Sequence, residues 1–142
     1  MTLDVHKVVA TRPYPPRVST FTKPFWSALN EGRFTTTQCR ECHRQTFPPK
    51  LVCPHCWSDK YEWVDMPVEG ELYSWTRIHA APAVFQPLAP YVVGIVDLDG
   101  RTRLACPLVV PDGVQVSVGS KVRMVVMAFD DGPLFAARVL GA

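Results

Sequence analysis

The sequence lacks several features that would assign a protein of this size to a function at once. No apolar run approaches the roughly 20 residues that a membrane-spanning helix needs, and no basic start is followed by a continuous apolar stretch. A Gly-x-Ser-x-Gly motif, a phosphate-binding loop and a dinucleotide fingerprint are also missing. We therefore expect a cytoplasmic protein without a membrane segment, and the sequence shows no sign of an active site.

An excess of charge of one sign is missing too. The 142 residues include 15 basic and 13 acidic side chains, interspersed along the chain, and the net charge is only +2. A nucleic-acid-binding domain typically gathers its basic residues into a stripe or patch, so this balance disfavours binding to DNA or RNA. Apolar residues make up 47% and charged residues 20% of the chain, which is typical of a globular protein.

The sequence does contain a distinctive cysteine pattern. Four of its five cysteines form two Cys-x2-Cys pairs, Cys39 with Cys42 and Cys53 with Cys56. Two such pairs can surround one Zn²⁺ ion with four thiolates, and four protein ligands leave no position for water or substrate. We therefore predict a structural zinc site. A rubredoxin-like iron site and two redox-active dithiols are the alternatives.

Other reactive side chains are few. His43 and His55 lie beside the cysteine pairs and could replace a thiolate, but four cysteines already have the required spacing. Cys106 stands alone in an apolar strand, where an inert, buried thiol is usual. His79 ends a predicted strand, a position more typical of a surface histidine than of a general base. We therefore predict no catalytic residue in this chain.

Composition and periodicity divide the chain into four segments. Residues 1–18 are rich in proline, which cannot donate a backbone hydrogen bond, and predict an extended arm without ladder pairing. Residues 19–32 predict a helix with Pro24 in its first turn and Gly32 as its stop. The aromatic face of this helix covers either the protein's own core or a partner. Residues 33–66 hold the cysteines between two predicted strands and form the expected zinc ribbon.

Residues 67–142 have a β pattern throughout. Five short runs are separated by turn signals, and a long proline-rich loop follows the first run. The predicted strands are Glu71–His79, Tyr91–Leu98, Arg103–Val110, Lys121–Phe129 and Leu134–Leu140. This arrangement suits a closed OB-type barrel better than a sandwich. The predicted fold is mostly β: an N-terminal helix and a rubredoxin-like zinc ribbon, followed by a five-stranded OB-type barrel.

Several of these motifs, taken in order along the chain, resemble one protein family. They are the aromatic helix Phe25–Gly32, the two cysteine pairs with Phe47-Pro48-Pro49 between them, and the segments Gly70–Thr76, Pro90–Leu98 and Val118–Val122. Together they resemble the zinc-ribbon plus OB-fold family of acyl-CoA-associated proteins, formerly a domain of unknown function, over about residues 20–140. His43 departs from the family pattern, which often has glycine there.

The resemblance implies a function that the residues alone do not show. Members of this family are small companion subunits of thiolase-superfamily enzymes (thiolases, acyltransferases and aldolases), and their partners carry out the chemistry. The expected function is thus a non-catalytic, zinc-containing subunit of a thiolase-type acyl-CoA complex. The implied partner is a thiolase-like catalytic subunit, in a hetero-oligomer such as a heterotetramer. Coenzyme A or acyl-CoA is the implied shared ligand.

A bound acyl-CoA would need cations for its phosphates and an apolar lane for its pantetheine. Lys50 in the ribbon, and Arg77 with His79 on the first barrel strand, could supply the polar contacts. Phe85 and Tyr91, in and after the proline-rich loop, could supply the apolar ones. These five residues are the candidate coenzyme A contacts.

Two other functions stay open at this point. A single-stranded nucleic-acid binder is the main alternative, because OB barrels and zinc ribbons both serve that purpose. Strand alternation places the aromatic rings of Tyr73 and Trp75 on one side, but the next two strands add only Arg101 and Arg103 near a turn. A stand-alone enzyme that uses Cys106 is the third hypothesis.

Overall fold

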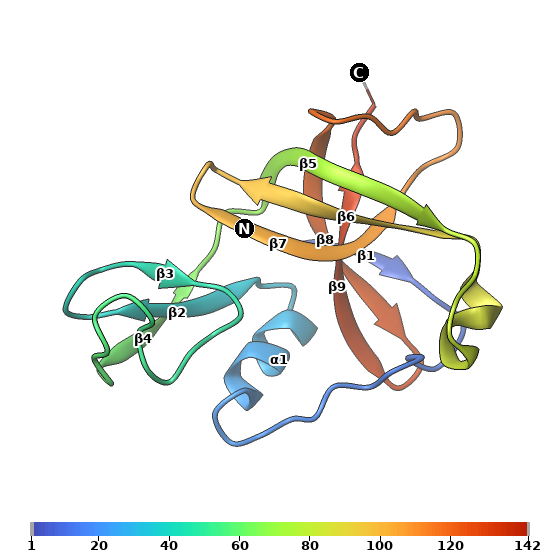
Figure 1. Ribbon diagram of the computed structural model, residues 1–142. Coiled ribbons are helices and arrows are strands. Elements are labelled where there is room, and N and C mark those ends of the chain that lie inside the picture. The colour runs from blue at the N-terminus through green and yellow to red at the C-terminus, as the bar shows by residue number, and fades with distance from the viewer. Residues whose placement is uncertain (1, 142) are drawn as a thin grey trace.

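The computed structural model describes residues 2–141, which contain two β-sheets and one α-helix (Figure 1). The elements are β1 (Asp4–Lys7), α1 (Lys23–Asn30), β2 (Thr35–Cys39), β3 (Gln45–Thr46), β4 (Tyr61–Asp65), β5 (Glu69–Ile78), the 3-10 helix η1 (Ala83–Leu88), β6 (Tyr91–Leu98), β7 (Thr102–Val109), β8 (Lys121–Phe129) and β9 (Gly132–Val139). Within this part of the chain, no helix is long and apolar enough to cross a membrane.

Helix α1 begins and ends where the local chemistry favours it. Just before the helix, the Ser19 N–H donates to Thr22 Oγ1 at 2.9 Å and the Thr22 N–H donates to Ser19 Oγ at 3.1 Å. Pro24 lies in the first turn, where a missing N–H breaks no hydrogen bond within the helix. Gly32, at φ +86°, turns the chain away after the helix. The predicted N-terminal helix is therefore confirmed.

The three-stranded sheet, in the order β3-β2-β4, forms the ribbon that carries the cysteines. Strands β2 and β4 are antiparallel, with Thr37 opposite Trp63. Thr36 Oγ1 donates to the Thr46 carbonyl, and Thr37 Oγ1 accepts the Lys50 N–H at 2.9 Å. Thr36 and Thr37 are at most 1% exposed. The interior of the ribbon is therefore tied by hydrogen bonds as well as by apolar packing.

Strands β5 to β9 close into a barrel in the order β5-β6-β7-β9-β8, and β8 pairs back to β5. The β7–β9 pairing is short and parallel, whereas the other pairings within the barrel are antiparallel. The five-stranded OB-type barrel that the sequence predicts is confirmed. Apolar side chains no more than 5% exposed fill its interior, among them Leu72, Val96, Leu98, Leu104, Val122, Met124, Ala137 and Val139.

A β-bulge in β5 changes the direction of its aromatic side chains. The pairing with β6 slips at Tyr73, which is left without a cross-strand partner. Beyond the slip, Trp75 lies opposite Gly94, on the face of the sheet that also carries Leu72, although the Trp75 side chain itself is 38% exposed. Tyr73 points to the outside, where the Arg103 guanidinium lies 3.9 Å from its ring centroid. The prediction that Tyr73 and Trp75 share one side is therefore wrong, because an inserted residue breaks the strict alternation.

The chain before α1 contains a strand that its prolines do not predict. Strand β1 pairs in parallel with β8, with Asp4 opposite Val125. It occupies the edge of β8 that β5 leaves open, because β5 pairs only with Lys121–Arg123 of β8. The expectation that residues 1–18 lack ladder pairing is therefore wrong for Asp4–Lys7. All the prolines of this segment come after β1.

Arg12 then attaches the rest of the arm to the turn between β8 and β9. Its backbone N–H donates to Asp131 Oδ1 at 2.8 Å, and its Nη2 donates to the Asp131 carbonyl at 2.9 Å. An ion pair of 3.5 Å joins the same two side chains. The arm thus docks on the protein's own barrel.

Four phenylalanine rings join the helix, the ribbon and the barrel. The ring centroid of Phe47, from the ribbon, lies 5.3 Å from that of Phe34 and 5.5 Å from that of Phe135 in β9. The Phe25 ring of α1 lies within 6.1 Å of all three. Tilted and edge-on contacts of this kind add stability beyond the burial of the rings. The aromatic face of α1 therefore covers the protein's own core, one of the two possibilities that the sequence leaves open.

Candidate functional site

The four paired cysteines lie in two turns of the same geometry. The His43 N–H donates to the Cys39 carbonyl at 3.0 Å, and the Trp57 N–H donates to the Cys53 carbonyl at 2.8 Å. Each turn ends in a left-handed residue, His43 at φ 63° and Trp57 at φ 66°. Residues with side chains adopt this conformation at a cost in free energy. Each tight turn brings the sulfur atoms of its two cysteines to the same side.

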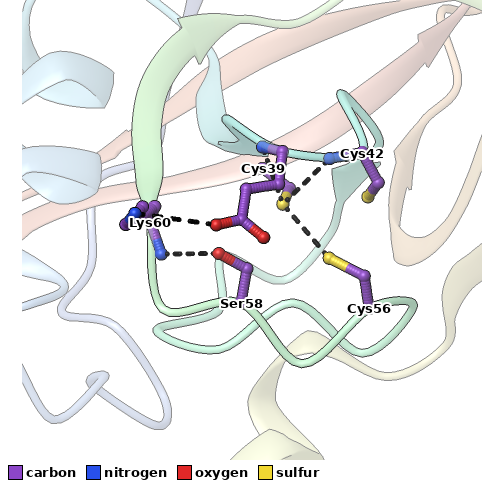
Figure 2. A network of polar contacts seen from close by, with 6 residues as sticks. Cys39, Cys42, Cys56, Ser58 and Lys60 are labelled. Atoms are coloured by element: carbon purple, nitrogen blue, oxygen red, sulfur yellow. Dashed lines mark hydrogen bonds and ion pairs between the residues drawn. The ribbon is translucent and has the colours of Figure 1, made fainter.

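The four sulfur atoms form one compact cluster. The Sγ atoms of Cys39 and Cys56 lie 3.5 Å apart, and those of Cys42 and Cys53 lie 3.6 Å apart. All four lie within 4.8 Å of one another. A tetrahedral ion with bonds of about 2.3 Å places its sulfur ligands about 3.8 Å apart. The four cysteines predicted from the sequence are thus positioned to hold one metal ion, and Figure 2 shows the sulfur atoms of Cys39 and Cys56 facing each other.

Backbone amides prepare this cluster for a cation. The N–H groups of Glu41 and Cys42 both donate to Cys39 Sγ at 3.4 Å (Figure 2). The Cys42 N–H is the largest cause that lowers the pKa of Cys39 to about 6, against desolvation by burial. The pKa of Cys56 is about 12: the Ser58 N–H lowers it, but the contact with Cys39 and desolvation raise it by more. Since neighbouring thiolates repel one another, a bound cation is needed to ionise all four.

The donor set determines what a bound ion can do here. Four thiolates complete a tetrahedral Zn²⁺ site and leave no open position, so the ion stabilises the fold and binds no substrate. The same set also suits iron. His43 and His55 are exposed and lie outside the group of four sulfur ligands. Neither histidine is needed to complete the site.

Lys60 links the two cysteine turns on the outside of the ribbon (Figure 2). Its Nζ lies 3.8 Å from Glu41 Oε1 in the first turn, and its backbone N–H donates to Ser58 Oγ after the second. The Lys60 and Glu41 side chains are 70% and 55% exposed. An ion pair this exposed contributes about 0–1 kcal/mol, so the backbone hydrogen bond from Arg40 to the Lys60 carbonyl and a metal held by the four cysteines would link the turns more strongly.

The candidate coenzyme A contacts are only partly brought together. The ring centroids of Phe85 and Tyr91 lie 6.0 Å apart. The end of β5 pairs with the start of β6, so Arg77 and His79 belong to the same end of the barrel as Tyr91. Both side chains are exposed. Lys50 lies in the ribbon, where its N–H donates to Thr37 Oγ1 of β2, and Figure 1 shows the ribbon strands and η1 (Ala83–Leu88) on different sides of the barrel. Four of the five residues thus lie at one end of the barrel, but Arg77 faces Val92 in the register and not Tyr91, so its side chain leaves the opposite face of the sheet from Tyr91.

The structure argues against the key residues of both alternatives, the stand-alone enzyme that uses Cys106 and the single-stranded nucleic-acid binder. Cys106 is 5% exposed, and its burial raises the pKa of its thiol to about 12. A thiol in this state is protonated at neutral pH and does not suit a nucleophile. For nucleic acid, the bulge separates Tyr73 from Trp75, and the Arg103 guanidinium covers the ring of Tyr73. These two rings do not form a stacking platform for successive bases.

A cleft that sequence reasoning does not predict lies between the ribbon and the tip of the β6–β7 hairpin. Its volume is about 480 Å³. Its lining consists of Gln38, His43, Arg44, Gln45, His55, Arg101 and Thr102. The two histidines and Arg44 are recognisable as polar neighbours of the cysteine pairs. Only the three-dimensional packing of the ribbon against the hairpin brings Arg101 to them.

A rubredoxin-like zinc ribbon followed by an OB barrel defines a class of two-part β-proteins. Two family models match the chain in this order: the ChsH2 rubredoxin-like zinc ribbon domain over residues 26–62 and the ChsH2 C-terminal OB-fold domain over residues 63–127. A DUF35 domain-containing scaffold protein of Methanothermobacter thermautotrophicus is 32% identical over 92 residues, which are 64% of this chain and 69% of that protein. The chain therefore belongs to the DUF35 family of ChsH2-type proteins, as its motifs predict.

Two further relatives are similar over different lengths. The benzoylsuccinyl-CoA thiolase subunit BbsA of Thauera aromatica is 31% identical over 71 residues, which are 50% of this chain and 48% of that subunit. The solved structure of the Ltp2-ChsH2(DUF35) aldolase contains a chain that matches with a TM-score of 0.75 and 27% identity. That match covers 88% of this chain and 98% of the other. The chain thus matches less than half of BbsA but nearly all of the aldolase's matching chain.

Proposed function

We propose that this chain is a non-catalytic, zinc-containing companion subunit of a thiolase-type acyl-CoA enzyme. The observation that carries the proposal is the match to a chain of the Ltp2-ChsH2(DUF35) aldolase, which covers 88% of this chain, more than the barrel alone could account for. The relatives named as a scaffold protein and as a thiolase subunit support the same role.

The chemistry of the chain's own groups agrees with this role. A metal held by four cysteines has no open position, and the Cys106 thiol is buried and protonated. The partner would therefore carry the reacting groups, and the reaction could be thiolysis, acyl transfer or aldol cleavage. The role of this chain would be to organise that partner in a hetero-oligomer such as a heterotetramer.

Within the complex, we assign a contact with coenzyme A to the end of the barrel near η1. Arg77 and His79 are exposed there and suit the phosphates, and the rings of Phe85 and Tyr91 suit the pantetheine. Lys50 lies in the ribbon and would meet a different part of the ligand. In the assembled complex, Arg77→Ala should weaken coenzyme A binding, whereas Arg40→Ala, on the ribbon, should not. Unchanged affinity in the Arg77 variant would remove this residue from the assignment.

Purification of the tagged chain from its native host, at moderate salt, tests the companion role. We expect mass spectrometry to identify a thiolase-like protein in stoichiometric amount, and native mass spectrometry to report a hetero-oligomer. The active site of that protein would then define the reaction. A chain that purifies alone, or together with nucleic acid, would refute the companion role.

A further inference from the structure

We propose that the cleft between the zinc ribbon and the β6–β7 hairpin binds a small molecule that carries a diphosphate group. Its volume of about 480 Å³ lies within the roughly 300–1,000 Å³ of small-molecule pockets. The residues that line it come from the ribbon and from the tip of the β6–β7 hairpin. The proposal therefore goes beyond the companion role and can be tested without a partner.

Two arginines reach this cleft from separate parts of the fold. Arg44 follows the first cysteine turn, and Arg101 belongs to the turn between β6 and β7. Within residues 2–141, neither side chain forms an ion pair or a side-chain hydrogen bond. A guanidinium binds two phosphate oxygens at once. Two guanidinium groups from the ribbon side and the barrel side suit an anion with two charged centres.

A second cleft at the same hairpin offers a comparison, because most of the charged groups on its lining are paired within the chain. It has a volume of about 580 Å³ and is lined by the acidic residues Glu69, Glu71, Asp97 and Asp99 together with Lys121 and other residues. Three of these carboxylates have cationic partners within the chain: Glu69 with Arg123, Glu71 with Lys121 and Asp97 with Arg103. No carboxylate lines the cleft that holds Arg44 and Arg101. Its positive charge has no counterpart on the lining.

Neutral donors complete the lining. The Gln45 Nε2 group donates to Gln38 Oε1 at 3.3 Å, an orientation that leaves the Gln38 amide free to donate. Thr102 and the two histidines add further polar atoms. The ribbon's own cations could instead balance the negative charge of the metal-bound thiolates. Arg101 has no such role, because it lies on the barrel, and its contribution therefore separates the two explanations.

Titration calorimetry on the full, zinc-loaded chain tests the proposal with two probes, inorganic pyrophosphate and ADP. We expect both probes to bind, with Arg44→Gln and Arg101→Gln each weakening the affinity at least about fivefold. Arg40→Gln is the matched control. It removes one positive charge from the same ribbon, where Arg40 pairs with Glu62 at 3.8 Å, and the affinity should change less than about twofold at physiological salt. If only ADP binds, the diphosphate comes from a nucleotide; if both bind equally, the diphosphate alone is recognised.

Three results would overturn the proposal. The first is a wild-type chain that binds neither probe. The second is equal weakening by Arg40→Gln and Arg101→Gln, which would indicate attraction by net charge only. The third is tighter binding of a single-stranded oligonucleotide that the same two variants abolish. Zinc content is measured on every variant. If Arg44→Gln loses zinc, its weaker binding is not interpreted, and the affinity of Arg101→Gln with full zinc content tests the proposal. Isolation of the chain without a partner would refute the companion role but would not affect the proposal of a diphosphate site, which calorimetry tests on the chain alone.

Discussion

The zinc ribbon and the barrel hold themselves together by different forces. The buried residues of the barrel are apolar, such as Leu98 and Met124, both 0% exposed, and burial of such surface contributes roughly 25 cal/mol per Å². In the ribbon, β2 buries Thr36 and Thr37, and the cysteine sulfur atoms lie at its end. We therefore expect the barrel to fold on its apolar core and the ribbon to depend on a bound ion. Stability in one chain thus has two separate chemical sources.

The largest expected effect is the removal of the metal. Chelation should unfold the ribbon and leave the barrel folded, since zinc binding contributes about 10–16 kcal/mol to the folding of small zinc domains. Two-dimensional NMR would show that the amide signals of residues 35–65 collapse while those of β5 to β9 stay dispersed. Cys106→Ala is the control and should retain one metal ion per chain, because Cys106 lies outside the cluster. Intact ribbon signals after chelation would contradict this dependence on metal.

A substitution in the barrel core should do the reverse: it should lower the stability of the barrel and leave the metal content of the ribbon unchanged. Leu98→Ala should lower the free energy of unfolding by about 2–5 kcal/mol, because it leaves a cavity among buried side chains. Denaturant titration measures the loss, and the metal content should stay at one ion per chain. Val118→Ala, in a loop and 70% exposed in the wild type, should change the stability by less than about 0.5 kcal/mol. Loss of metal in Leu98→Ala would show that the two regions are not separable.

The parts of the fold that local signals determine were predictable from the sequence. The predicted bounds of β6 and β8, Tyr91–Leu98 and Lys121–Phe129, are those of the structure. Both strands are apolar runs bounded by turn residues, and such signals act within a few residues. The cysteine pairs are equally local, because each turn, 39–43 or 53–57, brings its two sulfur atoms together through its own residues.

Features that depend on distant pairing were not predictable. Strand β1 pairs with β8, far along the chain, only because β5 covers just one part of that edge. The bulge at Tyr73 follows from how two strands register, and alternation along one strand does not reveal it. The separation of Lys50 from the other candidate coenzyme A contacts, and the meeting of Arg44 with Arg101, arise from the docking of two units. The sequence pattern of the ribbon or of the barrel, taken separately, does not predict either of these two features.

A substitution in the phenylalanine cluster between the ribbon and the barrel should lower stability by less, and it should change the number of unfolding transitions. Phe47→Ala removes the ribbon's ring from the cluster with Phe25, Phe34 and Phe135, at a cost of about 2 kcal/mol for a partly buried ring. We expect the ribbon and the barrel, coupled in the wild type, to unfold at separate temperatures in calorimetry. Phe85→Ala, at the far side of the barrel, should leave one transition. A single transition in Phe47→Ala would show that other contacts couple the regions.

The smallest effect concerns the arm, which belongs to the barrel and should not respond to the metal. The Arg12 N–H, more than the opposing desolvation or the Arg12 charge, holds the pKa of Asp131 below its ordinary value. A carboxyl group with a lowered pKa stabilises the folded state above its unfolded pKa of about 3.9 and loses this effect as the pH falls through the lower, folded value. In the chelated protein at neutral pH, Asp131→Asn should therefore speed hydrogen exchange of the Asp130 amide, which donates to the Ala10 carbonyl at 2.9 Å. Once the pH is below the folded pKa, variant and wild type should exchange at the same relative rate, because the wild-type carboxyl is then neutral too. If chelation alone released the arm, its anchorage would depend on the ribbon, and the division between a metal-held region and a self-folding one would have to be redrawn.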